Sequence, residues 1–188
     1  VANIGVGFDC VGMALNLYNT FSFEKAESDE LVGFGSGAIE NNLVLKAYKR
    51  LFEVSNKEYI PVRIKSVKNA VPSSSGLGSS ASCIVAGVLG ANYMLKNYFR
   101  PDYLLSVMTE IEGHPDNVSP ALLGGFTANA MDGKNVRYVK AEVPKNLVFA
   151  AFVPPVELNT ADARAVMPKR VSLKDSVFNL SRSALITA

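Results

Sequence analysis

The feature that most constrains the fold is a loop rich in glycine and serine that runs directly into a long apolar segment. The loop reads PSSSGLGSSA from Pro72 to Ala81, and the apolar segment continues to about Lys96. Glycines at positions 76 and 78 allow backbone conformations and close approaches that other residues resist. The apolar segment is too short and too often interrupted by Gly, Ser and Asn to cross a bilayer, so it predicts a helix buried in a globular domain.

The start of this predicted helix suits an anion. Ser79 and Ser80 fall in the first turn, where backbone N–H groups lack helical acceptors and the helix dipole favours negative charge. Their hydroxyls could also bind Mg²⁺, which prefers oxygen ligands. The loop is not a Walker A sequence, because no lysine follows the glycines. The residues alone leave two interpretations open: a phosphate-binding loop, or a serine-capped helix that follows a flexible linker.

Hydrophobic periodicity predicts a mixture of helices and strands along the chain. Helical spacing from Asn42 to Phe52 predicts a helix, and alternation over Leu17–Lys25 and Ile60–Val67 predicts two strands. Further helices are expected at 79–96, 101–112, 115–123, 160–166 and 172–187, and further strands at 126–131, 136–143 and 147–153. Helices and strands do not alternate strictly, which favours the α+β class, and a domain boundary is expected near Pro144.

Composition and charge argue against several classes of partner. The net charge is only +2 and basic residues are interspersed with acidic ones, so we expect neither nucleic acid nor a membrane as a partner. Cys10 and Cys83 lie far apart in apolar surroundings, which predicts buried, reduced thiols and a cytoplasmic location. No segment resembles a signal peptide. Because Val1 is not Met and Ser181–Ala188 stop within a helical pattern, we expect a fragment of a longer protein.

One glycine-rich segment competes with the loop at 72–81. Gly33–Ala38 fits the dinucleotide pattern G-x-G-x-x-A. Only Leu31 and Val32 precede it after the polar stretch Glu27–Glu30, so no proper first strand leads into the turn. Because this pattern is weak outside its strand–turn–helix context, we interpret the segment as a surface loop.

A second polar cluster reads EIEGHPDN from Glu110 to Asn117. A carboxylate at the end of the preceding helix could reach a metal ion held against the phosphate loop. His114, Asp116 and Asn117 could make polar contacts with a small molecule at the start of the next helix. The alternative is a polar turn between two helices, in which the side chains satisfy backbone donors. The sequence shows neither a recognisable Ser/His/Asp triad pattern nor the Cys/His spacing of a zinc site.

Two further segments carry polar groups among turn-forming residues. Asn3–Asp9 contains two glycines between two polar side chains. In Glu157–Arg164, Thr160 is expected to cap a helix, and Arg164 to lie one turn later on the same face. Either segment could equally be an ordinary turn whose polar side chains bind no ligand, and Arg164 could be an exposed arginine.

Together these segments resemble the GHMP kinases, a family named for galactokinase, homoserine kinase, mevalonate kinase and phosphomevalonate kinase. Pro72–Ala81 is similar to the family's P-x-x-x-G-L-G-S-S-A sequence. Within the family the resemblance is to the homoserine kinases, whose E-G-H-x-D-N-V-x-P-A-x-x-G-G block is similar to Glu112–Gly125. Asn3–Asp9 resembles their first motif, and Asn159–Arg164 resembles their S-T-x-x-A-R segment with Asn in place of the usual Ser.

This resemblance implies a fold and an activity. Residues 1–143 would form a ribosomal-protein-S5-like N-terminal domain that binds ATP, and residues 144–188 would begin an incomplete ferredoxin-like domain. The activity implied is phosphorylation of the hydroxyl of L-homoserine to O-phospho-L-homoserine, with ATP and Mg²⁺ as cofactors, and it leaves room for a homodimer. Two alternatives remain: a sister kinase that acts on mevalonate or a sugar, and a nucleotide-binding regulator that lacks transfer activity.

The resemblance also implies roles for individual residues. ATP would be bound by Pro72, Ser73, Ser74, Ser75, Gly76, Leu77, Gly78, Ser79 and Ser80, with Asn42 and Val44 on the adenine side. Mg²⁺ would be held by Ser80 and Glu112, with Glu110 as the alternative to Glu112. The amino-acid substrate would be bound by Asn3, Asp9, His114, Asp116, Asn117 and Arg164. The catalytic groups would be Asn117, Asp116, Thr160 and Arg164, with Asp116 a candidate base.

The chemistry of homoserine agrees with these roles. The molecule is a zwitterion with a hydroxyl group, so its site needs an anion, a cation and a hydrogen-bonding group. Asp9 could face the ammonium, and Arg164 could bind the carboxylate through two parallel hydrogen bonds. Asn117 or Asp116 could orient the hydroxyl. Phosphoryl transfer depends mainly on positioning and charge neutralisation, so a strong base need not be present.

Overall fold

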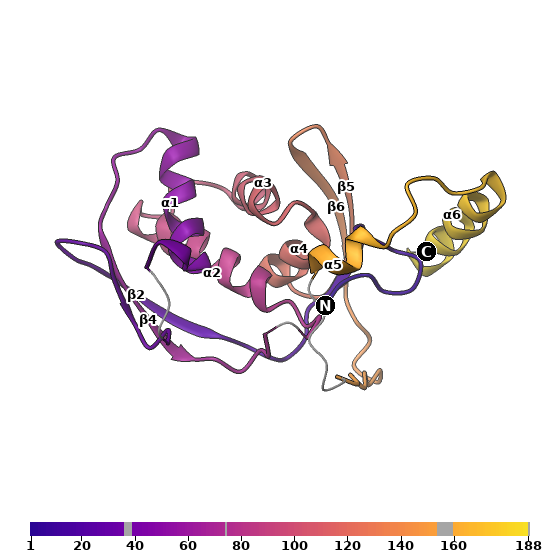
Figure 1. Ribbon diagram of the computed structural model, residues 1–188, viewed down its shortest axis with the longest axis horizontal. Helices are drawn as coiled ribbons and strands as arrows, with labels where there is room; N and C mark the ends of the chain where they lie inside the picture. The colour runs from indigo at the N-terminus through magenta and orange to yellow at the C-terminus, as the bar shows by residue number, and fades with distance from the viewer. Residues whose placement is uncertain (36–38, 74, 154–159, 188) are drawn as a thin grey trace.

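The computed structural model describes residues 1–35, 39–73, 75–153 and 160–187, and within them it contains two small β-sheets and a group of packed helices. The long strands β2 and β4 lie along one side of the molecule, and helices α1 to α4 lie on the other side of them (Figure 1). α6 stands at the far end of the molecule from β2 and β4. The arrangement is a mixed fold of helices and strands, as the α+β prediction requires.

The two sheets each contain three strands and differ in topology. β1 (Val11–Met13), β5 (Phe126–Asp132) and β6 (Asn135–Ala141) form an antiparallel sheet in the order β1-β5-β6. The second sheet has the order β2-β4-β3, with β2 (Thr20–Lys25) antiparallel and β3 (Glu30–Val32) parallel to β4 (Val62–Lys68). Two residues, Gly133 and Lys134, join β5 to β6, and Gly133 supplies the positive φ that such a tight hairpin favours.

Helices lie between the strands and beyond the last of them along the chain. They are the 3₁₀ helix η1 (Ile39–Asn41), α1 (Leu43–Ser55), α2 (Ser79–Met94), α3 (Pro101–Glu112), α4 (Pro115–Leu123), α5 (Thr160–Ala165) and α6 (Leu173–Thr187). Each helix predicted from the sequence is present with its bounds shifted by a few residues at most. None of the described helices is both long enough and apolar enough to cross a membrane.

The core is built around α2, whose residues Ile84, Val88 and Ala91 are buried. The apolar face of α1 packs against α2 and buries Tyr48 and Leu51 completely. Complete burial of a leucine-sized side chain stabilises a fold by roughly 1.5–3 kcal/mol. The two helices approach closely at Gly87, where an added Cβ would lie 2.2 Å from the carbonyl oxygen of Val44.

Two glycines and a proline fix the polar turns. Gly78, with φ +83°, is the N-cap of α2, and Gly113, with φ +93°, ends α3 in the left-handed conformation that favours glycine. Pro115 then starts α4, because a proline is tolerated where the helical N–H has no acceptor. Gly12 of β1 packs closely against the first turn of α4: a Cβ added to Gly12 would lie 1.7 Å from the carbonyl oxygen of Asp116. These residues determine where α2 begins, where α3 ends and where α4 begins.

Some predictions from the sequence were wrong. Residues 147–153 are not a strand, and Val148 and Phe152 are each 93% exposed, because no described segment offers them a ladder partner. Cys10 is exposed in the turn before β1, and Cys83 on α2 is only half-buried, so neither is the buried thiol that was expected. Both are free thiols.

The strands β1 and β3 were not predicted, because three residues are too few to show an alternating pattern. β3 does precede the glycine-rich segment that begins at Gly33, contrary to the expectation of no strand there. However, the described residues that follow form the 3₁₀ helix η1, and Ser36, Gly37 and Ala38 lie outside the described residues. The division into domains at 143 and 144 remains a prediction.

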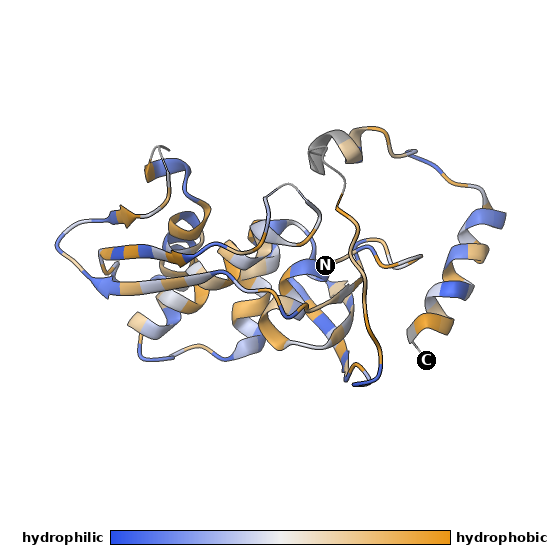
Figure 2. Cartoon of the chain, turned by 90° about the horizontal axis from the view of Figure 1, so that it is seen from below, coloured by the Kyte–Doolittle hydropathy of each residue, from blue (hydrophilic) through white to orange (hydrophobic). Residues whose placement is uncertain are grey.

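α6 exposes an amphipathic surface. Leu180 and Leu185 on it are 69% and 76% exposed, and in Figure 2 apolar and polar residues alternate along the helix, which stands apart from the body of the molecule.

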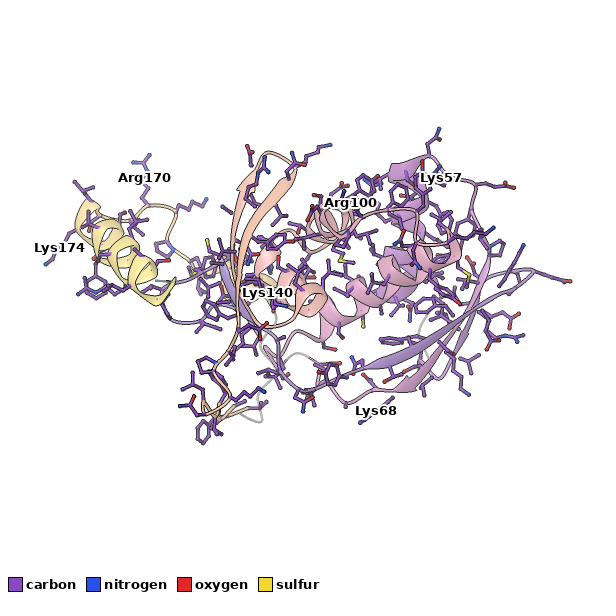
Figure 3. All side chains as sticks on the ribbon, turned by 180° about the vertical axis from the view of Figure 1, so that it is seen from behind. Lys57, Lys68, Arg100, Lys140, Arg170 and Lys174 are labelled. Carbon is purple, nitrogen blue, oxygen red and sulfur yellow. The ribbon has the colours of Figure 1, made fainter. Side chains whose placement is uncertain are left out.

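Basic side chains are widely spread: Lys57 and Lys174, labelled in Figure 3, lie at opposite ends of the molecule.

Candidate active site

Four segments that are distant in the sequence meet near the middle of the molecule. They are the N-terminal loop, the glycine-serine loop before α2, the turn from α3 to α4, and the region of α5, and Figure 1 shows α5 and the N-terminus beside α4. Residues of all four line a cavity of about 260 Å³. The lining residues are Ala2, Asn3, Phe8, Gly76, Glu112, His114, Asn117, Ala163, Arg164 and Met167.

The start of α2 is open to an anion. Gly78 has no side chain to cap the helix, and the first helical hydrogen bond runs from the Ser82 N–H to the Gly78 carbonyl, 3.0 Å away. The N–H groups of Ser79 and Ser80 therefore have no helical acceptor. This excludes the serine-capped helix that the sequence left open. Earlier in the loop, the Ser75 hydroxyl donates to the Pro72 carbonyl at 2.8 Å.

The remaining loop residues have different positions. Pro72, Ser73 and Gly76 are exposed, and Leu77 is half-buried. Gly76 has a φ of +72° and open space where a Cβ would be. Ser74 lies outside the described residues.

Ser80 and Glu112 bring two oxygen donors together at this helix start. The Ser80 hydroxyl donates to Glu112 Oε2 at 3.1 Å. Burial raises the pKa of Glu112 above its usual value, although the hydrogen bond from Ser80 acts in the opposite direction. Hard oxygen donors of this kind fit Mg²⁺. Glu110, the alternative metal ligand, instead forms an ion pair with Arg50 and lines a different cavity.

The turn between α3 and α4 contains a buried carboxylate. The Asp116 side chain is completely buried, and its Oδ1 is hydrogen-bonded to Nδ1 of His114. This hydrogen bond raises the pKa of His114. Asp116 Oδ2 and Asn117 Oδ1 are buried and have no hydrogen-bond partner among the described residues. Buried polar oxygens are rarely left without a partner, so these two atoms indicate a place where a ligand could donate hydrogen bonds.

Asp9 and Arg164 form an ion pair next to the cavity, which Arg164 lines. Arg164 donates to both carboxylate oxygens of Asp9, at 3.0 and 2.5 Å, and its guanidinium lies 5.2 Å from the centre of the Phe8 ring. Asn3 accepts a hydrogen bond from the Asp9 N–H at 2.9 Å. Both Asn3 and Asp9 have positive φ, a conformation that Asn and Asp tolerate better than most residues. Asn3 therefore fixes the backbone that carries Asp9.

Comparison with known proteins identifies a family domain in the chain. Residues 42–125 match the family described as GHMP kinases N terminal domain. A homoserine kinase from Clostridium beijerinckii is 45% identical over 190 residues, which cover all of this chain and 63% of that protein. Residues 42–125 therefore carry the sequence of a GHMP kinase N-terminal domain.

Further homoserine kinases give similar matches. A homoserine kinase from Clostridium botulinum is 43% identical over 188 residues, which cover 98% of this chain and 63% of that protein. The crystal structure of a homoserine kinase from Cytophaga hutchinsonii superimposes with a TM-score of 0.78 and 30% identity, covering 98% of this chain and 62% of that one. The chain thus spans about 63% of the length of the curated relatives that it matches.

Besides Ser74, three of the site residues predicted for a GHMP kinase lie outside this cluster or have side chains outside the described part of the chain. Asn42 is the N-cap of α1: its Oδ1 accepts a hydrogen bond from the Leu45 N–H at 3.1 Å. A separate cavity of about 360 Å³ at this helix start is lined by Leu31, Phe34, Gly35, Ile39, Asn41, Asn42 and Leu43. The Val44 side chain is buried in the core. Thr160 is the first residue of α5, and its side chain lies outside the described part of the chain.

Four residues that line the cavity were not among the predicted site residues: Ala2, Phe8, Ala163 and Met167. Phe8 lies beneath the Arg164 guanidinium, and Met167 lines the same cavity. An aromatic residue next to Asp9 was visible in the first motif, and it could have been recognised as a partner for a cation. Met167 lies beyond the end of α5 and carried no comparable signal.

Proposed function

We propose that the protein transfers the terminal phosphoryl group of ATP to the hydroxyl of L-homoserine, giving O-phospho-L-homoserine and ADP on the route to threonine. The observation that carries this proposal is the proximity of Ser80, at an open helix start, to Glu112, which lines a small cavity that also contains paired positive and negative charges. The names of the relatives at 43–45% identity support the same activity.

The phosphates would bind at the first turn of α2, where the N–H groups of Ser79 and Ser80 lack acceptors and the dipole favours negative charge. Ser80 and Glu112 would hold Mg²⁺, which neutralises phosphate charge when it is bound. Phosphoryl transfer depends largely on such positioning and neutralisation. The cavity beside Asn42 has both apolar lining residues, among them Leu31 and Phe34, and polar ones, which supports an adenine position there.

The amino acid would bind in the cavity of about 260 Å³. Asp9 would face the ammonium and Arg164 the carboxylate. The partnerless oxygens of Asp116 and Asn117 would accept a hydrogen bond from the substrate, with Asp116 as the candidate that accepts the hydroxyl proton. Thr160 is proposed near the transferred phosphate.

The wider context of the chain is also a proposal. We place the first domain at residues 1–143 and the beginning of a ferredoxin-like domain at 144–188. The exposed apolar side chains of Val148, Phe152 and Leu185 support this, because such side chains normally pack against other parts of a domain. A cytoplasmic location and a homodimer are compatible with these assignments.

An ADP-release assay across substrates tests the activity. Purified full-length protein with ATP and Mg²⁺ is given L-homoserine, mevalonate or galactose in turn, and ADP is measured by a coupled reaction. We expect turnover with L-homoserine only, because mevalonate and galactose carry no ammonium for Asp9. Turnover with mevalonate or galactose would assign a sister kinase instead. Nucleotide binding without turnover of any substrate would support a regulator that lacks transfer activity.

A further inference from the structure

The ion pair between Asp9 and Arg164 joins two groups that a zwitterionic ligand would need separately. Asp9 belongs to the N-terminal loop and Arg164 to α5, and they lie 155 residues apart in the sequence. Their side chains are 30% and 39% exposed, so water reaches the pair. Both hydrogen bonds run in parallel from one guanidinium to one carboxylate, which is the geometry that Arg would also use with a ligand carboxylate.

Each partner is held in place independently of the other. Asn3 fixes the backbone of Asp9, and the Phe8 ring lies against the guanidinium of Arg164. These two contacts favour the present positions of the carboxylate and the guanidinium. A ligand that binds Arg164 through a carboxylate must therefore compete with Asp9 for the same donors. An ammonium that binds Asp9 must in the same way compete with Arg164.

The cost of this competition differs between classes of ligand. A molecule with only a carboxylate gains Arg164 but leaves Asp9 without its cation. A molecule with only an ammonium gains Asp9 but leaves Arg164 without its anion. A zwitterion replaces both partners at once, so no charge is left unpaired. Unpaired charges in a partly desolvated site are costly, and specificity often depends on penalties of this kind against the wrong ligand.

We infer that the Asp9–Arg164 ion pair acts as a charge filter. Ligands that carry both an ammonium and a carboxylate displace the ion pair readily, whereas ligands that carry only one of these groups displace it poorly. This inference rests on the proposed function for the identity of the zwitterion, and it adds the origin of the selectivity. If the ion pair filters ligands in this way, Asp9 determines specificity through its contact with Arg164 as well as through its contact with the ligand.

The filter predicts a gain of binding, which two independent subsites do not. With Asp9→Asn, Arg164 loses its competitor, so 4-hydroxybutanoate, the analogue without an ammonium, should bind about threefold to tenfold more tightly than it binds the wild type. With Arg164→Gln, Asp9 is released, so 3-aminopropan-1-ol, the analogue without a carboxylate, should bind more tightly by a similar factor. Both variants should bind L-homoserine less tightly than the wild type does.

Calorimetric titration of the full-length protein with these three ligands tests the filter. Glu112→Gln removes a negative charge from the same cavity without breaking the pair, and Asp132→Asn removes one from the distant β5–β6 hairpin. Neither should tighten 4-hydroxybutanoate binding by more than a small factor. An equal gain in Glu112→Gln would overturn the filter, because general repulsion would then explain the result.

The outcomes also separate the filter from the proposed function. If the wild type binds and phosphorylates L-homoserine but Asp9→Asn shows no gain for 4-hydroxybutanoate, the filter is wrong and the proposed function stands. If the wild type neither binds nor phosphorylates L-homoserine, the proposed function is wrong and the filter is overturned with it.

Discussion

The Ser80 hydroxyl donates a hydrogen bond of 3.1 Å to the Glu112 carboxylate, and this contact joins the first turn of α2 to the last residue of α3. The two residues lie 32 positions apart in the sequence. Burial raises the pKa of Glu112, although the Ser80 hydroxyl and His114 act to lower it. A cation bound between these oxygens and a phosphate would stabilise the ionised carboxylate.

The role of Glu112 is tested by Glu112→Gln, which keeps the shape of the side chain and removes its charge. We expect kcat to fall by about 100-fold or more, while the Kd for ATP changes much less, because the metal's charge matters most where negative charge develops in the transition state. Steady-state kinetics give kcat, and calorimetry with ATP and Mg²⁺ gives the Kd.

Glu110→Gln is the matched control for this experiment. Glu110 lies two residues earlier on the same helix, but it is paired with Arg50 at the surface of α1 and α3. Removing its charge should leave kcat within about twofold of the wild type, because exposed ion pairs contribute little. If Glu110→Gln is instead the crippling change, Glu112 has been assigned the wrong role.

The phosphate loop is tested at Gly78. Its φ of +83° is strained for any residue with a Cβ, and a Cβ there would approach Asn117 Oδ1 at 3.4 Å. Left-handed backbone costs a residue with a side chain roughly 1–2 kcal/mol, more for a β-branched one, so the first turn of α2 should shift. We expect Gly78→Val to abolish measurable ATP binding and to lower the Tm only modestly.

Gly133→Val controls for backbone strain alone. Gly133 has a φ of +61° in the β5–β6 turn, and no atom lies within 4 Å of its added Cβ. This variant should lose a similar amount of stability but keep the ATP affinity of the wild type. Unchanged ATP affinity in Gly78→Val, measured by calorimetry, would show that the loop does not bind the phosphates.

The parts of the fold that the sequence predicted are those that depend on local signals. The helix after the glycine-serine loop follows from its apolar run and from the conformational freedom of Gly78. The turn after Glu112 follows from Gly113 and Pro115, since a glycine ends a helix and a proline begins one. These signals place Glu112 at the end of one helix and Asp116 in the first turn of the next.

The parts that the sequence did not predict depend on partners distant in the chain. β1 and β3 are strands only because β5 and β4 pair with them. Residues 147–153 have a strand-like apolar pattern, but no described segment pairs with them. The charges of Asp9 and Arg164 were expected to face a ligand, and only the folded chain reveals that they face each other. No local pattern carries information on such pairings.

A pH-dependent contribution to stability is expected from Asp29, in the turn between β2 and β3. Its carboxylate accepts hydrogen bonds from the Tyr59 hydroxyl at 2.6 Å and the Val62 N–H at 3.2 Å, and it pairs with Lys49 at 2.7 Å. Burial acts to raise the pKa of Asp29, but Lys49, Tyr59 and the Val62 N–H together outweigh it and lower the pKa. The ionised carboxylate therefore stabilises the folded chain.

Asp29→Asn should lower the free energy of unfolding at pH 7 by roughly 1–3 kcal/mol, because hydrogen bonds to a charged group are lost. A lowered folded-state pKa means that this contribution is present above the unfolded value of 3.8 and is lost as the pH falls through the folded value. Urea unfolding at several pH values should therefore show that the difference in unfolding free energy between wild type and variant shrinks below about pH 4.

A difference in unfolding free energy that stays constant down to pH 2 would exclude the ionised carboxylate as its origin. Asp132→Asn, at an exposed pair with Arg137, should have little effect at any pH.

The close packing of α1 on α2 predicts a difference between two glycines of the same helix. At Gly87 an added Cβ would meet the backbone, 2.2 Å from the Val44 carbonyl oxygen and 2.9 Å from the Tyr48 nitrogen. At Gly90 it would meet only the Phe23 ring, at 2.5 Å. In a helix, alanine is more stable than glycine by up to about 1 kcal/mol, and this gain applies at both positions. The Phe23 ring can rotate away from a methyl group at position 90, whereas the α1 backbone cannot move away from one at position 87.

Gly87→Ala should therefore lower the free energy of unfolding by roughly 1–3 kcal/mol, and Gly90→Ala should lower it clearly less. Urea unfolding measures both, and equal losses would show that Phe23 is as immobile as the α1 backbone.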